Sequence, residues 1–207
     1  MTQHNEQEPL DERAVAADPM KQFASWYERA EGSGIHLPMA MTLATSSKDG
    51  KPSARIVLLK QADERGFIFY TNYQSRKGRD LIENPQAALV FFWHDLDRQV
   101  RAEGSISRVP ADESDRYFAT RPRESQIGAH ASAQSEPIDG RGPLEAEAAR
   151  LEKEFSGKAV PRPAHWGGFC LRPSRVEFWQ GREGRLHDRI VYSRDPAGRW
   201  IVGRLSP

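Results

Sequence analysis

Cysteine and long apolar runs are almost absent from this sequence. Cys170 is the only cysteine among 207 residues, which excludes an intramolecular disulfide and any zinc site built from several cysteines. No segment approaches the roughly 20 consecutive apolar residues of a membrane span, and residues 1–8 lack the basic start and apolar core of a signal peptide. We therefore predict a protein of the reducing cytoplasm that does not enter a membrane.

An excess of charge of either sign is also missing. The chain has 30 Lys and Arg residues against 29 Asp and Glu residues, so its net charge is only +1. Because dedicated nucleic-acid binders usually carry a clear basic excess, we expect no nucleic-acid partner. The glycine-rich signatures of Rossmann and P-loop proteins and the His-Glu-x-x-His zinc motif are absent too. His94 with Asp95 and Asp97 is better explained as a solvated turn than as a metal site, so no metal is expected.

The composition, with 38% apolar and 29% charged residues, is that of one globular domain of ordinary size. Residues 1–17 are polar with little periodicity and are predicted to form a flexible arm. A single domain is expected over residues 18–207. It should begin with a helix, because Asp18 can cap a helix and the missing N–H of Pro19 costs nothing in the first turn.

Alternating apolar residues predict a series of short strands through this domain. The first two are joined by Lys48-Asp49-Gly50, a turn sequence typical of a hairpin. Strands are predicted over residues 40–45, 53–59, 66–71, 87–93, 99–109, 168–178, 189–193 and 200–204, and further helices over 75–83, 111–120 and 143–155. Short strands at this spacing indicate an α+β fold with a mainly antiparallel β-barrel and peripheral helices.

Two segments combine cations with hydroxyl groups in ways that suit phosphate. Ser75-Arg76-Lys77 places two cations at the start of a predicted helix, where a bound anion would relieve their conflict with the helix dipole. Tyr117, Arg121 and Ser125 recur every four residues, although Pro122 must break or restart the helix. The alternatives are a solvated first turn and an ordinary helix end. Two phosphate sites would imply two phosphorylated ligands.

Further candidates lie on predicted strands and loops. In the strand over residues 55–60, Arg55 and Lys60 point to opposite faces, which fits either contact with two anionic groups or an edge strand with solvated ends. The polar residues Gln99, Gln134 and Ser135 can hydrogen-bond a heterocycle, but each alone is weak evidence.

The segment around His187 combines aromatic residues with fixed positive charge. Phe178 and Trp179 precede it closely, and Arg185 and Arg189 lie two residues to either side of the histidine. On a strand the two arginines and His187 would share one face, and the arginines would disfavour protonation of the imidazole. Such a surface suits a planar, anionic, redox-active ligand better than a purely structural role.

Taken together, these motifs resemble the pyridoxine (pyridoxamine) 5′-phosphate oxidase family over about residues 18–207. The resemblance is carried by residues 55–60, 69–72, 75–77, 98–100, 121–128, 134–135, 166–169 and 177–189, which occur in the family's order and at its spacing. It implies an FMN-binding split β-barrel that forms an obligate homodimer, with both cofactors at the subunit interface.

The resemblance also implies roles for individual residues. Arg185 and His187 would form the catalytic pair over the substrate's pyridine ring, and Lys60, Tyr117, Arg121 and Ser125 would hold the substrate phosphate. FMN contacts are implied for Arg55, Ile56, Val57, Leu58, Leu59, Lys60, Tyr70, Thr71, Arg76, Lys77, Gln99, Gln134, Ser135, Trp179 and Arg189.

The implied reaction oxidises pyridoxine 5′-phosphate and pyridoxamine 5′-phosphate to pyridoxal 5′-phosphate. Hydride passes from C4′ to the flavin, dioxygen is reduced to hydrogen peroxide, and the amine also releases ammonia. One departure is that the family often has Arg-x-x-Tyr in its N-terminal arm, whereas residues 1–17 contain Arg13 and no tyrosine.

Two other functions are considered. A related split-barrel flavin oxidase acting on another ring system, such as a phenazine, is disfavoured by Tyr117, Arg121 and Ser125, which a substrate without phosphate would not need. A flavin- or pyridoxal-phosphate-binding carrier without turnover is disfavoured because the substrate residues accompany the flavin residues.

Overall fold

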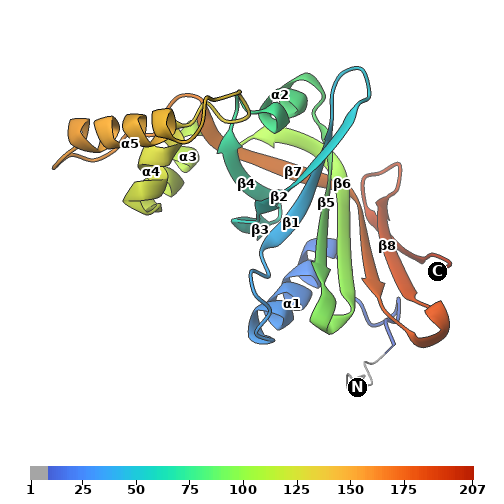
Figure 1. Cartoon of the computed structure of the whole chain (residues 1–207). Coiled ribbons are helices and arrows are strands. Elements are labelled where there is room, and N and C mark those ends of the chain that lie inside the picture. Colours follow the sequence, from blue (N-terminus) through green and yellow to red (C-terminus); the bar gives the residue numbers. More distant parts are fainter. Residues whose placement is uncertain (1–8) are drawn as a thin grey trace.

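The structure is a computed structural model that describes residues 9–207. It is built on one curled antiparallel sheet with strand order β2-β1-β5-β6-β7-β4-β3, in which β8 also pairs with β7 and β9 with β8 (Figure 1). The strands are β1 (Ala40–Ser46), β2 (Pro52–Leu58), β3 (Gln61–Asp63), β4 (Gly66–Asn72), β5 (Gln86–Trp93), β6 (Arg98–Arg108), β7 (Trp166–Gln180), β8 (Asp188–Arg194) and β9 (Trp200–Arg204).

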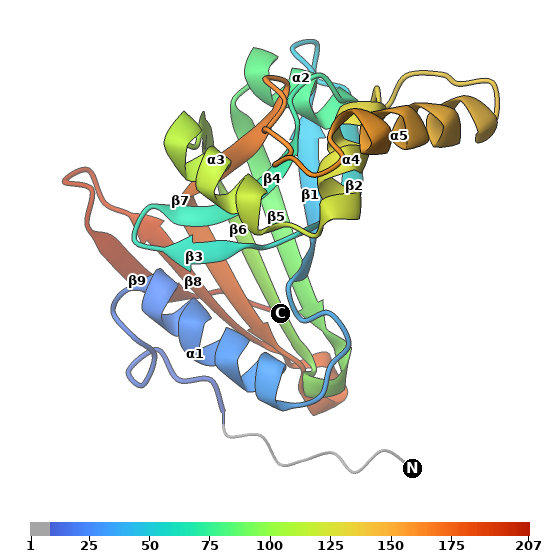
Figure 2. The same ribbon diagram turned by 90° about the vertical axis from the view of Figure 1, so that its left-hand side faces the viewer.

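The main core lies on the concave side of the sheet and is covered by helix α1 (Pro19–Gly32). Asp18 caps this helix by accepting a hydrogen bond from the Met20 N–H, as its sequence predicts. Phe23 is fully buried, with its ring centroid 4.8 Å from that of Phe67 and 5.0 Å from that of Phe91. Figure 2 shows α1 lying along the sheet, at the end away from the other helices.

The remaining helices gather at the opposite end of the sheet (Figure 1). They are α2 (Arg76–Glu83), α3 (Ala111–Thr120), α4 (Arg123–Ala131) and α5 (Gly142–Glu154). Phe118, Ile127 and Leu151 form a second core there, against Trp166 at the start of β7. No helix was predicted over residues 121–128, yet α4 occupies most of this segment. The chain ends α3 at Arg121 and, after Pro122, restarts as α4, because Gln126 and Ile127 supply a buried face.

The predicted α+β class with a mainly antiparallel sheet is confirmed, as is the hairpin of β1 and β2. Gly50 at its tip has φ +83°, a conformation that favours glycine. The short strand β3 was not predicted, since three residues leave almost no periodic pattern. β2 is an edge strand of this chain, and its side chains alternate between half-buried, as Arg55 and Val57, and exposed, as Ile56 and Leu58.

Part of the predicted N-terminal arm, residues 1–8, lies outside the described residues, so its flexibility stays a prediction. Residues 9–17 lie against β8 and β9. Glu12 forms an ion pair of 2.7 Å with Arg204, and the Tyr192 hydroxyl donates a 2.7 Å hydrogen bond to the Ala16 carbonyl. Among residues 9–207, no helix is long and apolar enough to cross a membrane, and no cluster of His, Cys, Asp or Glu is arranged to hold a metal ion.

Candidate active site

A cavity of about 810 Å³ lies between the edge strand β2, strand β4 and helices α2, α3 and α4. Its walls bring together residues that are far apart in the sequence. Those predicted as site residues are Ile56, Val57, Leu58, Lys60, Tyr70, Thr71, Lys77, Tyr117, Arg121, Ser125 and Gln134. The two segments singled out for phosphate thus meet in one place, which neither pattern alone indicates.

Lys77 reaches into the cavity from the first turn of α2. Its Nζ donates to Gln134 Oε1 at 2.8 Å and to Thr71 Oγ1 at 3.2 Å. Burial, together with the nearby charge of Arg55, lowers the pKa of Lys77 to about 8. Within residues 9–207, Lys77 has no carboxylate within ion-pair distance. An anion near this side chain would favour its charged form.

Arg121 lies at the end of α3, with its guanidinium carbon 4.6 Å from the centre of the Trp166 ring. Burial lowers the pKa of Arg121, although Tyr117 opposes this. Its Nη1 is buried and has no hydrogen-bond partner among the described residues, the one side-chain atom there of which this is true. A buried donor left unpaired costs free energy, so this nitrogen indicates a site for an anionic ligand.

Three aromatic rings form the wall behind Arg121. Tyr70 stacks on Tyr117 at 4.0 Å with an interplanar angle of 21°, and on Trp166 at 5.4 Å with an angle of 12°. Burial and the charge of Glu113 raise the pKa of Tyr70 to about 12, so its phenol stays protonated at neutral pH. The stack gives the cavity one flat apolar wall beside its cations.

Trp166 was not predicted as a site residue, although residues 166–169 are among those that carry the family resemblance. The signal available was the glycine pair after the tryptophan. A Cβ at Gly167 would collide with the Tyr73 hydroxyl, and one at Gly168 would press on Tyr70 and Val109. The glycines therefore allow the close packing that sets the ring wall.

Arg55 stands beside this cavity but is not part of its lining. Its Nη1 donates to Thr45 Oγ1 at 2.8 Å and its Nη2 to Ser53 Oγ at 2.7 Å, with Asp80 at 3.8 Å. Asp80 is buried and accepts a 2.7 Å hydrogen bond from Thr45 Oγ1. Burial lowers the pKa of Arg55, and Asp80 opposes that effect. The guanidinium is therefore held in one orientation, close enough for its charge to lower the pKa of Lys77.

A second group of predicted site residues lies on the central strands. Gln99, Trp179 and Arg189 are register neighbours on β6, β7 and β8 and so share one face of the sheet. Glu177, almost fully buried, accepts hydrogen bonds from Arg189 Nε at 2.8 Å and Nη2 at 3.1 Å. This face is opposite to the one that α1 covers.

The expectation that Arg185, His187 and Arg189 share one strand face is wrong. β8 begins only at Asp188, so Arg185 and His187 belong to the loop that connects β7 and β8. Arg185 is exposed with φ +62°, and the His187 ring lies 4.6 Å from the Trp179 ring. Gly181 to Gly184 break the alternation on which the prediction depended.

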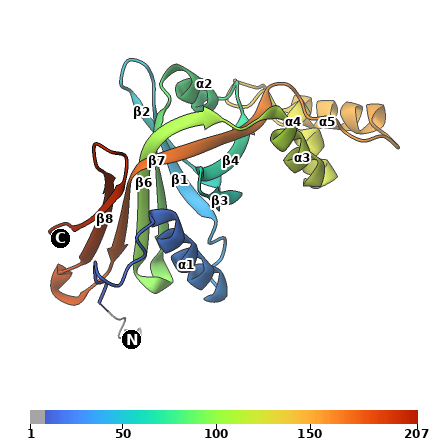
Figure 3. The ribbon, with the colours of Figure 1, turned by 180° about the vertical axis from the view of Figure 1, so that it is seen from behind.

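The two groups lie at opposite ends of β7 in a single chain. Trp166, at its start, lines the cavity, whereas Trp179 near its end contacts His187. The strand itself runs from the end of the sheet that carries α3 and α4 toward the end that carries α1 (Figures 1 and 3). Thirteen strand residues correspond to about 40 Å of extended chain, so the two groups lie far apart along β7. Two further predicted residues, Arg76 and Ser135, are exposed and belong to neither group.

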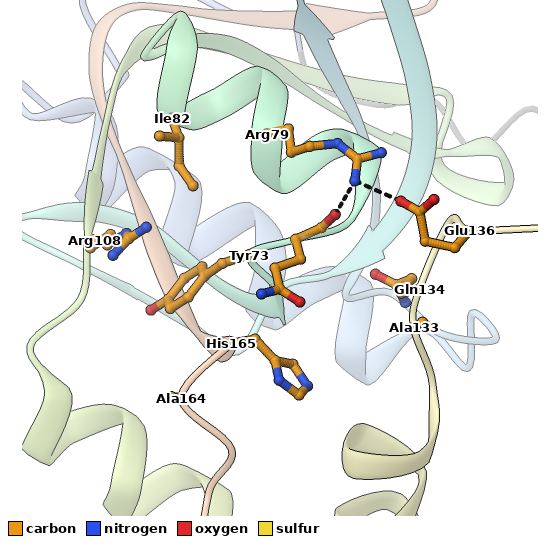
Figure 4. Close-up of a pocket in the computed structure, with 10 residues that line it drawn as sticks. Tyr73, Arg79, Ile82, Arg108, Ala133, Gln134, Glu136, Ala164 and His165 are labelled. Carbon is orange, nitrogen blue, oxygen red and sulfur yellow. Dashed lines mark hydrogen bonds and ion pairs between the residues drawn. The ribbon is translucent and has the colours of Figure 1, made fainter.

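A second cavity, of about 630 Å³, borders the first and shares Gln134 with it (Figure 4). One of its cations, Arg79, is already paired, 2.7 Å from Glu136 and 2.7 Å from the Gln74 carbonyl oxygen, and the other arginine, Arg108, stacks on the Tyr73 ring. It contains none of the residues predicted to hold the substrate phosphate. The first cavity is the better anion site. It is lined by Lys60, Lys77 and Arg121, and none of these forms an ion pair with a carboxylate within residues 9–207.

The whole chain was compared with known proteins. A family model described as pyridoxamine 5′-phosphate oxidase matches residues 28–154. The chain belongs to this family. A second model, described as the pyridoxine 5′-phosphate oxidase C-terminal dimerisation region, matches residues 166–207, which span β7, β8 and β9.

Relatives match over almost the full length. The pyridoxine/pyridoxamine 5′-phosphate oxidase of Rubrobacter xylanophilus is 56% identical over 198 residues, covering 96% of this chain and 91% of that protein. The enzyme of the same name from Burkholderia lata is 56% identical over 200 residues, covering 96% and 93%. Among solved structures, PhzG from Burkholderia lata 383 in complex with tetrahydrophenazine-1-carboxylic acid matches with a TM-score of 0.91 and 32% identity, covering 97% of this chain and 98% of that one. The predicted split-barrel fold is confirmed.

Proposed function

We propose that the chain is an FMN-dependent oxidase that converts pyridoxine 5′-phosphate and pyridoxamine 5′-phosphate to pyridoxal 5′-phosphate. Family membership supports the oxidase, and relatives 56% identical carry the corresponding name. The observation that carries the choice of substrate is the buried, unpartnered Nη1 of Arg121, with Lys60, Tyr117 and Ser125 in the same cavity. One guanidinium, one amine and two hydroxyls match the oxygens of a phosphate monoester.

The residues present also fit FMN. Its phosphate needs fixed cations and hydroxyls, and Lys77, Thr71 and the oriented Arg55 supply them at the cavity and beside it. Its flat ring system needs apolar surface and amide groups, which Trp179 and Gln99 offer on the sheet face. The other proposed FMN contacts are Ile56 to Lys60, Tyr70, Arg76, Gln134, Ser135 and Arg189.

Substrate residues would work mainly by positioning. Lys60, Tyr117, Arg121 and Ser125 would anchor the phosphate, so that Arg185 and His187 can orient the pyridine ring and stabilise charge that develops near C4′. Bound FMN would supply the hydride acceptor, with dioxygen as the final oxidant and hydrogen peroxide as its product. The alcohol gives the aldehyde directly, whereas the imine formed from the amine is hydrolysed to the aldehyde and ammonia.

A homodimer would join the two groups of site residues. The sheet face that carries Gln99, Trp179 and Arg189 also exposes apolar side chains, with Phe92 57% and Ile56 63% exposed in the single chain. Exposed apolar area of this kind is typical of a protein interface. A second copy on this face would place its Arg185 and His187 near the cavity of the first. The family's C-terminal dimerisation region covers β7 and β8, the strands that carry Trp179 and Arg189.

A phenazine-type oxidase is the second candidate, because PhzG has the same fold at 32% identity. Burkholderia lata has both relatives, and this chain is more similar to its phosphate oxidase, at 56% identity. A substrate with a single carboxylate would leave part of the Lys60, Tyr117, Arg121 and Ser125 set unused. We therefore favour the phosphorylated substrates. Cys170, a buried free thiol, is compatible with the proposed cytoplasmic location.

The proposal is tested with the purified protein, reconstituted with FMN and supplied with each phosphate ester in air. Pyridoxal 5′-phosphate and hydrogen peroxide should form in equal amounts, with ammonia from the amine alone. Oxidation of tetrahydrophenazine-1-carboxylic acid in place of both esters would refute the choice of substrate.

A further inference from the structure

Asp188 is the point where the loop carrying Arg185 and His187 joins strand β8. Its carboxylate accepts hydrogen bonds from three separate parts of the chain. Arg182 Nε donates to Oδ2 at 2.8 Å, Arg204 Nη1 donates to Oδ1 at 2.7 Å, and the Leu10 N–H donates to Oδ2 at 3.2 Å. Burial opposes its ionisation, but these donors outweigh burial and lower the pKa of Asp188. The carboxylate is therefore charged at neutral pH and fully engaged.

The loop itself is closed by a contact between its two ends. The backbone N–H of Arg182 donates to His187 Nδ1 at 3.1 Å, and Gln180 pairs with Asp188 at the base. Because a donor faces Nδ1, the neutral imidazole carries its proton on Nε2. The free edge of His187 thus presents a donor. Its ring is also held against Trp179 at 4.6 Å.

Asp188 acts on the opposite side of the sheet from the site. It lies in one register row with Gln180 and Arg98, and Arg98 stacks on Trp26 of α1. The next residue, Arg189, faces the other way, toward Glu177 and Trp179. Asp188 therefore lies on the α1 side of the sheet and holds the loop through Arg182. The side chains of that loop with proposed roles, Arg185 and His187, belong to the opposite side.

We propose that Asp188 is the positioning residue of the Arg185–His187 loop, and that the N-terminal segment strengthens its hold. Arg204 binds Asp188 and Glu12 at once, and its Nη2 also donates to the Leu10 carbonyl. Residues 10–12 are thus tied to the base of the loop. This inference rests on the proposed function for its effect on catalysis, but the ordering of the loop depends only on contacts within the chain.

The test compares three isosteric variants of the FMN-loaded protein. Asp188→Asn removes the charge that binds Arg182 and Arg204. Glu12→Gln removes the charge that pairs with Arg204 and so weakens only the attachment of residues 10–12 to the base of the loop. Asp195→Asn is the matched control, because Asp195 lies on the hairpin of β8 and β9, is similarly shielded and pairs with Arg199, away from the loop.

Hydrogen exchange followed by mass spectrometry reports on the loop directly. Asp188→Asn should speed exchange of peptides covering residues 181–188 at least several-fold, Glu12→Gln should do so to a smaller extent, and Asp195→Asn should not. The rate of anaerobic flavin reduction by saturating substrate should fall roughly 10- to 100-fold in Asp188→Asn, while the affinity for FMN stays unchanged. A merely structural defect would lower FMN affinity and reduction together.

Unchanged exchange in Asp188→Asn, or a reduction rate equal to that of Asp195→Asn, would overturn the proposal. If Asp188→Asn does not fold, Glu12→Gln decides: faster exchange of residues 181–188 than in Asp195→Asn supports the proposal, and unchanged exchange refutes it. Failure of the unmodified protein to oxidise either ester would instead refute the proposed function, and the exchange comparison would still decide the role of Asp188.

Discussion

Replacing Arg121 by methionine should weaken use of the phosphorylated substrate and leave the fold as stable as before or more stable. The guanidinium is half-buried against Trp166 and has no carboxylate partner among the described residues, so without a bound anion the fold bears the cost of a desolvated charge. Methionine keeps apolar contact with the ring and removes that charge. The melting temperature of the flavin-free protein should therefore stay constant or rise.

The kinetic effect follows from the Nη1 atom that lacks a partner. A hydrogen bond to a charged group contributes about 1.5–3 kcal/mol, so losing one to the substrate phosphate lowers kcat/KM about 10- to 150-fold. Steady-state kinetics with pyridoxine 5′-phosphate measure this loss. The same assay with pyridoxine, which has no phosphate, should show little change between the two proteins.

The control is Arg116→Met, on the same helix, since Arg116 is exposed, pairs with Asp112 and does not line the cavity. Arg116→Met should leave kcat/KM unchanged for both pyridoxine 5′-phosphate and pyridoxine. An equal loss with pyridoxine and with its phosphate in Arg121→Met would refute the reasoning, as would a large drop in melting temperature.

Three further predictions concern the walls, the cofactor site and the interface. Trp166→Leu should raise KM for the phosphate esters several-fold, because Arg121 and Tyr70 lose the ring against which they pack; unchanged KM would contradict this. FMN affinity, measured by fluorescence quenching, should be full below pH 8 and fall as pH rises above it, since burial lowers the pKa of Lys77 to about 8 and only its charged form attracts the phosphate. Lys77→Arg should move that fall to higher pH, and an identical pH profile would count against the assignment. Phe92→Asp should raise the dimer dissociation constant at least 100-fold in light scattering and release FMN, because an unpaired carboxylate in an interface costs several kcal/mol; a stable, loaded dimer would exclude this face as the interface.

Much of the fold follows from local patterns in the sequence. The Asp18-Pro19 helix start, the Asp49-Gly50 hairpin and the alternation along β2 each result from forces within a few residues, and the structure confirms them. What local patterns could not give is α4, because Pro122 is compatible with ending a helix and with restarting one. Whether the helix restarts depends on burying Ile127 against Phe118 of α3 and Leu151 of α5, which both belong to other helices.

The site was predicted in pieces whose arrangement required the tertiary structure. Lys77 and Arg121 were recognised from separate helix ends, and only packing brings both into one cavity. Trp166 supports Arg121 with the face of its ring rather than with a charge, and in the sequence only the glycine pair that follows it indicates this close packing. Arg185, His187 and Arg189 were expected on one strand face from their spacing of two, whereas β8 begins only at Asp188 and the first two belong to a loop. The roles that the family resemblance implies for these residues stay predictions.

The proposed function depends on hydride transfer from a phosphorylated pyridine substrate to a flavin held by this chain. It is tested most directly by mixing the FMN-loaded protein with pyridoxine 5′-phosphate in the absence of oxygen and recording flavin absorbance. Without oxygen the flavin should be bleached as one pyridoxal 5′-phosphate forms per flavin, and admitting air should restore its absorbance. A protein that binds FMN but keeps the oxidised spectrum with both phosphate esters would contradict it.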